Sequence, residues 1–254
     1  MPVISCQQLM AMILLHAPPF VQQNNSAHLT TVVLSIAKAL VYVSYFSVLV
    51  PLFALIAKRN FWADTLMKLL CSLVLISAFS DIISYILSKF SISNLQVGNL
   101  YCLLSFIVIS LIYRQFLKES RTMIAIITIL FVVFFGIDSF FLQKITTFQS
   151  YTRILASIIC IGYAVLFYNR SNKTSPVNDP VRDSPFWINT AFWYYFTVNV
   201  FLFCASSFIF NEAPTNIAMV FWGFHNFNNI VRNLLLTLGI YLYQRERPKN
   251  FDLY

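Results

Sequence analysis

The chain has 254 residues, of which 59% are apolar, 17% aromatic and 10% charged, and its mean hydropathy is +0.73. Soluble domains carry about 25% charged residues, so this composition excludes a soluble globular protein, a disordered chain and a collagen. The formal net charge of +8 comes without any basic run that would indicate a nucleic-acid partner. It is typical of a multi-pass membrane protein with positively charged cytoplasmic loops.

Residues 1–30 differ from the rest of the chain. Val3–Leu15 is apolar but short, and no Lys or Arg precedes it. We interpret this region as an N-terminal extracytoplasmic arm that lies at the membrane surface. A cleaved signal peptide and an over-extended translation start are the alternatives.

Seven apolar stretches follow, each long enough to cross a bilayer as a helix. About 20 residues are needed to span roughly 30 Å of hydrocarbon, and none of the stretches alternates as a barrel strand does. The sequence therefore predicts an all-α, seven-transmembrane-helix bundle over residues 31–243, followed by a basic cytoplasmic tail, 244–254. The predicted spans are approximately 31–57, 66–87, 97–117, 123–142, 149–168, 186–210 and 216–243.

The distribution of Lys and Arg between the predicted loops sets the orientation. One side carries Lys89 and Lys144, whereas the other carries ten cations. These ten are Lys58, Arg59, Lys118, Arg121, Arg170, Lys173, Arg182, Arg245, Arg247 and Lys249. Cytoplasmic loops are the positive ones, so the N-terminus is predicted outside and the C-terminus in the cytoplasm.

Several ionisable residues fall inside the predicted spans, where charge is costly and indicates function or pairing. Lys38 and Asp81 both lie about 10 Å below the predicted outer surface. Asp138 and Arg153 are nearly symmetric about the turn between the fourth and fifth spans, so we predict that they form a structural ion pair. Lys38 and Asp81 either form a second buried pair or line a cavity that is open to the outside.

The last span carries the sharpest polar pattern. His225, Asn228, Asn229, Arg232 and Asn233 recur at the spacing of one helix face. Such a stripe is unfavourable against lipid, so it is predicted to face the bundle interior. His225 is also the one side chain in the spans whose unperturbed pKa lies near physiological pH.

Known seven-helix families fit poorly. The last span has no lysine for a retinal Schiff base, and one histidine within the spans does not provide the facing pair that haem needs. Ser77 with Asp81, and His225 with Asn229, slightly resemble the zinc-binding alkaline-ceramidase superfamily, but Asn229 replaces a histidine ligand. The five scattered cysteines have no CxxC spacing, so no metal site is assigned.

The chain does resemble uncharacterised multi-pass membrane proteins of Bacteroidota. The similar phrases are Lys38–Val50, Ser80–Leu87, Asn99–Tyr101, Ser150–Arg153, Phe186–Asn189 and His225–Asn233. The resemblance covers most of residues 35–243. It implies seven helices and a location in the inner (cytoplasmic) membrane, and it supplies no activity.

These observations favour a non-enzymatic membrane sensor or binding protein with an outward-facing polar pocket, whose partners are the lipid bilayer and a second protein for signalling. The predicted ligand-binding residues are Lys38, Asp81, Tyr101, His225, Asn229, Arg232 and Asn233. No catalytic residue is assigned, and the ligand and any cofactor are unknown. A small secondary transporter and an intramembrane metal-dependent hydrolase are the alternative functions.

The orientation makes a direct prediction for labelling. Single cysteines introduced at Gln96 and Ser175 of a cysteine-free variant should react with an impermeant maleimide from opposite sides of the membrane. Intact cells should label the cysteine at position 96, and position 175 should react only after lysis. Labelling of both positions from the outside would show that the charge count gives the wrong topology.

Overall fold

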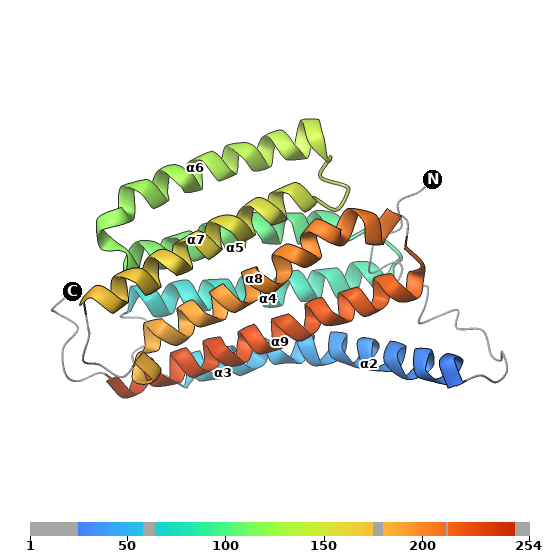
Figure 1. Ribbon diagram of the computed structural model, residues 1–254, viewed down its shortest axis with the longest axis horizontal. Helices are drawn as coiled ribbons and strands as arrows, with labels where there is room; N and C mark the ends of the chain where they lie inside the picture. Colours follow the sequence, from blue (N-terminus) through green and yellow to red (C-terminus); the bar gives the residue numbers. More distant parts are fainter. Residues whose placement is uncertain (1–24, 58–63, 175–179, 212, 247–254) are drawn as a thin grey trace.

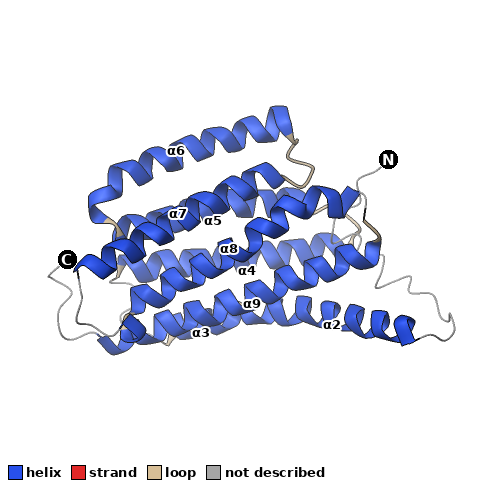
Figure 2. Ribbon diagram, viewed as in Figure 1, coloured by secondary structure: helices blue, strands red, loops and turns tan. Residues whose placement is uncertain are grey.

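A computed structural model describes residues 25–57, 64–174, 180–211 and 213–246, and every regular element in these ranges is a helix (Figures 1 and 2). The long helices are α2 (Asn25–Ser47), α3 (Leu49–Ile56), α4 (Thr65–Lys89), α5 (Leu95–Phe116), α6 (Arg121–Ile137), α7 (Ser150–Thr174), α8 (Ser184–Asn211) and α9 (Thr215–Glu246). Short helical turns occur at η2 (Lys118–Ser120), η3 (Asp138–Leu142) and η4 (Pro180–Arg182). The predicted all-α fold is confirmed.

The ends of the predicted domain differ from the structure. The first helix begins at Asn25, six residues before the predicted span, and α9 continues to Glu246, into the predicted tail. Residues 1–24 of the predicted arm and 247–254 of the predicted tail lie outside the described residues.

Six of the seven predicted spans are long and apolar enough to cross a membrane. They are Thr31–Ile56, Thr65–Lys89, Leu95–Phe116, Lys118–Leu142, Ser150–Asn172 and Ser184–Ser206. The 32 residues of α9 give ample length, but its polar stripe leaves it outside this set. The crossing of α9, and with it the seven-span count and the orientation, stays a prediction.

Six helices form a closed ring around a common interior. In order around the ring, α9 packs against α8, α8 against α7, α7 against α5, α5 against α4 and α4 against α3, which returns to α9. The helix α2 also packs along α9, whereas α6 packs mainly on α5 and lies at the periphery (Figure 1). Side chains from most of the chain can therefore meet inside the ring.

The outside of the bundle is apolar. Large hydrophobic side chains such as Phe46, Ile129 and Phe201 are 69%, 64% and 72% exposed. Exposed apolar surface on this scale marks contact with lipid or protein rather than with water. The pattern agrees with the span lengths and supports a multi-pass membrane protein.

The first span is broken between α2 and α3. Proline at position 51 has no N–H to donate to the carbonyl of Ser47, and its ring crowds that carbonyl. The α-helix is accordingly interrupted at Val48. The Ser47 hydroxyl donates to the Ser44 carbonyl (2.7 Å) and accepts from Asn233 Nδ2 (2.8 Å), so the break lies beside the polar stripe of α9.

Two glycines allow α9 to approach its neighbours closely. A Cβ atom on Gly223 would lie 2.8 Å from Cβ of Ala37 on α2, and one on Gly239 would lie 2.7 Å from Cγ1 of Ile188 on α8. Small residues at such contacts let membrane helices pack backbone to backbone. Next to the second contact, the Ser184 hydroxyl donates to the Gly239 carbonyl (2.7 Å).

The close contacts predict that positions 223 and 239 cannot hold a side chain larger than that of glycine without a loss of stability. Gly223→Ala and Gly239→Ala should each lower the free energy of unfolding by about 1–3 kcal/mol, because the added methyl group overpacks the contact. Gly162→Ala is the control, since no atom lies within 4 Å of its added Cβ. Thermal unfolding in detergent would measure all three variants. Equal stability of Gly239→Ala and Gly162→Ala would contradict the close packing.

Candidate functional site

The polar stripe of α9 faces the bundle interior. Asn228, Arg232 and Asn233 are buried, whereas Phe224 and Phe227 on the other side of the helix are exposed. Because polar groups are unfavourable against hydrocarbon, the helix turns this face toward other protein groups. Period-matched polarity in the sequence thus identified the buried face.

Arg232 is the centre of the interior polar contacts. Its Nη1 donates to the Tyr101 hydroxyl on α5 (3.1 Å), and its Nη2 donates to Asn233 Oδ1 (3.2 Å). The guanidinium also lies over the ring of Tyr195 on α8, 4.7 Å from the ring centre. A cation in a membrane protein needs such partners. The guanidinium therefore links α5, α8 and α9.

Asp81 on α4 is influenced by Arg232 and not by Lys38, so the first of the two alternatives for Lys38 and Asp81 fails. The nearby charge that acts on this carboxyl group is Arg232, and Lys38 forms no ion pair among the described residues. The reason is topological, since α2 packs along α9 while α3 is the neighbour of α4. A Lys38–Asp81 pair is therefore wrong, and the structure does not bring Lys38 to the other predicted residues by any hydrogen bond or ion pair within its described part.

His225 is enclosed by aromatic rings and held by one asparagine. Its ring stacks on Trp222 with 4.8 Å between ring centres, and Phe203 and Tyr195 lie at 5.9 and 6.2 Å. Nδ1 lies 2.6 Å from Asn199 Oδ1.

The bond to Asn199 sets the tautomer of the histidine. The amide nitrogen of Asn199 already donates to the Tyr195 carbonyl (2.7 Å), so its Oδ1 is the acceptor and His225 Nδ1 carries the proton. Within the described residues Nε2 has no hydrogen-bond partner. The neutral imidazole thus presents Nε2 as a free acceptor, and protonation would convert it into a donor.

Arg153 on α7 contacts Asn99 instead of Asp138. Its Nη2 donates to Asn99 Oδ1 (3.1 Å), and its guanidinium carbon lies 4.5 Å from the centre of the Phe148 ring. Its Nε is buried without a hydrogen-bond partner in the described part of the chain. The guanidinium also acts electrostatically on His225, as Arg232 does, so the two arginines and the histidine share one region.

The predicted ion pair between Asp138 and Arg153 is wrong. Asp138 is fully buried where α6 passes into the π-helical turn η3, and its Oδ2 accepts from the Thr152 hydroxyl (2.6 Å). Successive residues on a helix point about 100° apart. Thr152 therefore faces Asp138, while Arg153 faces the interior. The symmetry of the two positions about the turn correctly predicted that Asp138 contacts α7, but the contacting residue is Thr152 and not Arg153.

We define the central polar site as Asp81, Tyr101, Arg153, Asn199, His225 and Arg232. Five ring helices contribute to it, and its charges are two guanidiniums and one carboxyl group. Asn229, another predicted member, is half-buried on the same face but makes no hydrogen bond within the described residues. Asn233 supports the site by accepting from Arg232 and donating to Ser47.

Sequence reasoning missed two contributors on α8, Tyr195 and Asn199. They lie four residues apart on one face of a span that is rich in aromatic residues. Both are buried. A buried asparagine in an apolar span is the signal that would have identified Asn199.

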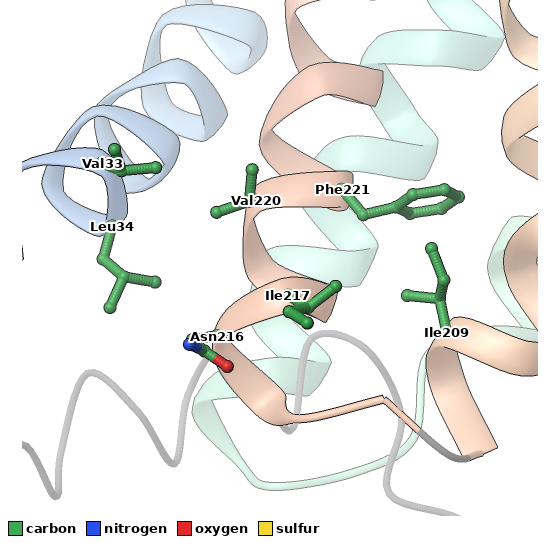
Figure 3. Close-up of a pocket in the computed structure, with 7 residues that line it drawn as sticks. All are labelled: Val33, Leu34, Ile209, Asn216, Ile217, Val220 and Phe221. Atoms are coloured by element: carbon green, nitrogen blue, oxygen red, sulfur yellow. The ribbon is translucent and has the colours of Figure 1, made fainter. Parts of the chain in front are cut away.

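Two hollows of the described surface lie away from the central polar site. One, of about 470 Å³, is an apolar groove between α2, α8 and α9, lined by Val33, Leu34, Ile209, Asn216, Ile217, Val220 and Phe221 (Figure 3). The other, of about 220 Å³, lies between the ends of α5 and α6. The outward-facing polar pocket therefore stays a prediction.

Comparisons with known proteins match no protein-family model, no curated protein and no solved structure. The resemblance to Bacteroidota membrane proteins thus stays a prediction. Among the described residues no three His, Cys, Asp or Glu side chains are grouped to hold a metal ion. The residues of the central polar site are those from which a function must be inferred.

The contacts of Asp138 and Arg153 make a prediction for a double-mutant cycle. Thr152→Val should lower the free energy of unfolding by about 1–3 kcal/mol, because it leaves a buried carboxyl group without a partner. Its effect should be strongly non-additive with Asp138→Ala, since the two side chains are directly bonded. Asp138→Ala and Arg153→Ala should be closer to additive in the same unfolding measurement. A larger coupling for Asp138 with Arg153 than for Asp138 with Thr152 would restore the ion pair.

Proposed function

We propose that the protein is an integral membrane binding protein or sensor whose central polar site takes a small anionic ligand from the outer side. The observation that carries the proposal is the charge of the site. Arg153 and Arg232 share the bundle interior, and Asp81 is the one carboxyl group among the described residues that acts on Arg232. A bound anion would balance the remaining positive charge.

The cost of buried charge supports a ligand rather than a purely structural role. An isolated charge at membrane depth is unfavourable by several kcal/mol, so a structural cluster would be expected to contain equal numbers of both signs. Neutral amides and hydroxyls are sufficient to hold membrane helices together. Helix packing therefore does not explain why the interior holds a second guanidinium, that of Arg153, whose buried Nε has no partner among the described residues.

The arrangement around His225 supports ligand recognition. The aromatic rings and Asn199 fix the imidazole, and Nε2 remains as a polar atom with no partner among the described residues. A hydrogen phosphate or a half-protonated dicarboxylate would donate its acidic proton to this nitrogen, while the guanidiniums donate hydrogen bonds to its anionic oxygens. The connections between the described helices are short, so we propose that a signal would leave the membrane through a protein partner.

A small secondary transporter is a second candidate because of the break in the first span. Transporters bind their substrates beside interrupted helices. The α2–α3 break at Val48 is joined to the site by the bond between Ser47 and Asn233, which in turn holds Arg232. Accumulation of a bound anion inside proteoliposomes would assign the transporter over the sensor.

The proposal predicts that small anions stabilise the purified protein and that this effect depends on His225. Acetate, succinate, phosphate and sulfate would be compared with chloride by thermal unfolding in mild detergent. A ligand at a hundredfold excess over Kd adds about 2.7 kcal/mol to the unfolding free energy, so at least one anion should raise Tm clearly. His225→Phe should fold but lose most of that increase.

Phe224→Leu is the matched control, because Phe224 lies on the exposed side of the same helix. It should keep the response to the anion. Failure of every anion to raise Tm, or an undiminished response in His225→Phe, would contradict the proposed function.

A further inference from the structure

A second polar feature lies at the opposite end of α5 from its start at Leu95. A cavity of about 220 Å³ opens where α5 ends and α6 begins, and it is lined by Leu111, Arg114, Gln115 and Arg121. The charge distribution predicts that this end faces the cytoplasm. None of the four residues belongs to the central polar site.

The two arginines leave this cavity positively charged. Arg121 folds over the end of α5, where its Nε donates to the backbone carbonyl of Arg114 (3.1 Å). The guanidinium of Arg114 forms no hydrogen bond or ion pair with any residue that the structure describes. Glu119, the acidic residue of the connection, is engaged in an ion pair with Arg170 of α7. No carboxylate therefore lines the cavity to neutralise the guanidiniums.

The cavity also combines charge with an apolar side. Leu111 lies one helical turn before Gln115, and hence deeper in the span, while Arg114 is in the last turn of α5. Exposed apolar side chains of α6, including Met123 and Ile126, extend from the same end toward the membrane centre. An occupant with a charged head at the surface and apolar chains below it matches both features.

We propose that this cavity binds the phosphate of an anionic phospholipid headgroup. Guanidiniums are well suited to phosphate because they offer several donors in a fixed plane. Basic pockets between transmembrane helices at the cytoplasmic surface bind anionic lipid headgroups. Arg114 supplies an uncommitted guanidinium, and Arg121 supplies the donors that remain after its bond to α5. The acyl chains follow the exposed surface of α6.

The capping of α5 by Arg121 does not account for Arg114. The bond from Arg121 satisfies a carbonyl at the end of α5 and is a sufficient structural role for that residue. The Arg114 guanidinium has no comparable structural role among the described residues. The lipid proposal therefore rests most directly on Arg114, and its test begins there.

The test measures binding of dioctanoyl phosphatidylglycerol, dioctanoyl phosphatidylcholine and inorganic phosphate to the full chain in mild detergent. The wild type should prefer phosphatidylglycerol over phosphatidylcholine. Arg114→Gln should weaken phosphatidylglycerol binding severalfold while it keeps the α5 cap, which uses the backbone. Arg114→Gln with Arg121→Gln should weaken binding by at least about tenfold, since two charged donors are lost.

The double variant Lys89→Gln with Lys144→Gln is the matched control, because it removes two positive charges at the other end of the bundle. It should bind phosphatidylglycerol as the wild type does. Unchanged binding by both Arg114→Gln and the double arginine variant would overturn the proposal, as would an equal loss in the lysine control. Equal affinity for both lipids would also overturn it. Inorganic phosphate binding as tightly as phosphatidylglycerol would assign the site to free phosphate and overturn the lipid assignment.

Discussion

The cost of placing polar groups in hydrocarbon organises this protein. Backbone groups in a bilayer must be satisfied within the helix, which accounts for the long α-helical spans. The same cost turns the stripe on α9 inward and requires partners for each charge. Arg232 meets this requirement through Tyr101, Asn233 and the face of Tyr195. These partners come from three ring helices, so satisfying one guanidinium also fixes how the helices are placed around the interior.

The helix α9 holds this arrangement because it can approach its neighbours closely. Gly223 admits Ala37 of α2, and Gly239 admits Ile188 of α8. Helices that come this close gain dispersion contacts, which replace the hydrophobic effect as a driving force between membrane helices. The two close contacts lie on either side of Arg232 along α9. The glycines therefore fix the helix on which His225 and Arg232 project, and the polar side chains need not supply all of the packing energy.

The sequence allowed the helices and the buried face of α9 to be predicted because both follow from periodicity and length. Periodicity and length did not predict which individual side chains contact one another. Asp138 and Arg153 are at mirrored positions about a turn, yet a step of one residue rotates a side chain by about 100°, so Thr152 makes the contact with Asp138. Lys38 and Asp81 were predicted to lie at one depth, but depth does not specify which helices are neighbours. Asn199 was missed because the two asparagines inside that span, Asn189 and Asn199, are ten residues apart and form no periodic stripe.

The two groups of arginines follow different physical rules. Arg153 and Arg232 lie inside the ring, where an unmatched charge is unfavourable and each cation needs protein or ligand groups as partners. Arg114 and Arg121 lie at a helix end, where long side chains reach the headgroup region and charge is inexpensive. An anion at the first group would relieve an electrostatic cost that the fold already carries, and would therefore couple to the packing of α5, α7, α8 and α9. An anion at the second group would be held at the surface, between the end of α5 and the start of α6, away from the residues of the central polar site. A ligand-dependent change in the ring would consequently originate at the central polar site, and the α5–α6 cavity would instead anchor the bundle in the bilayer.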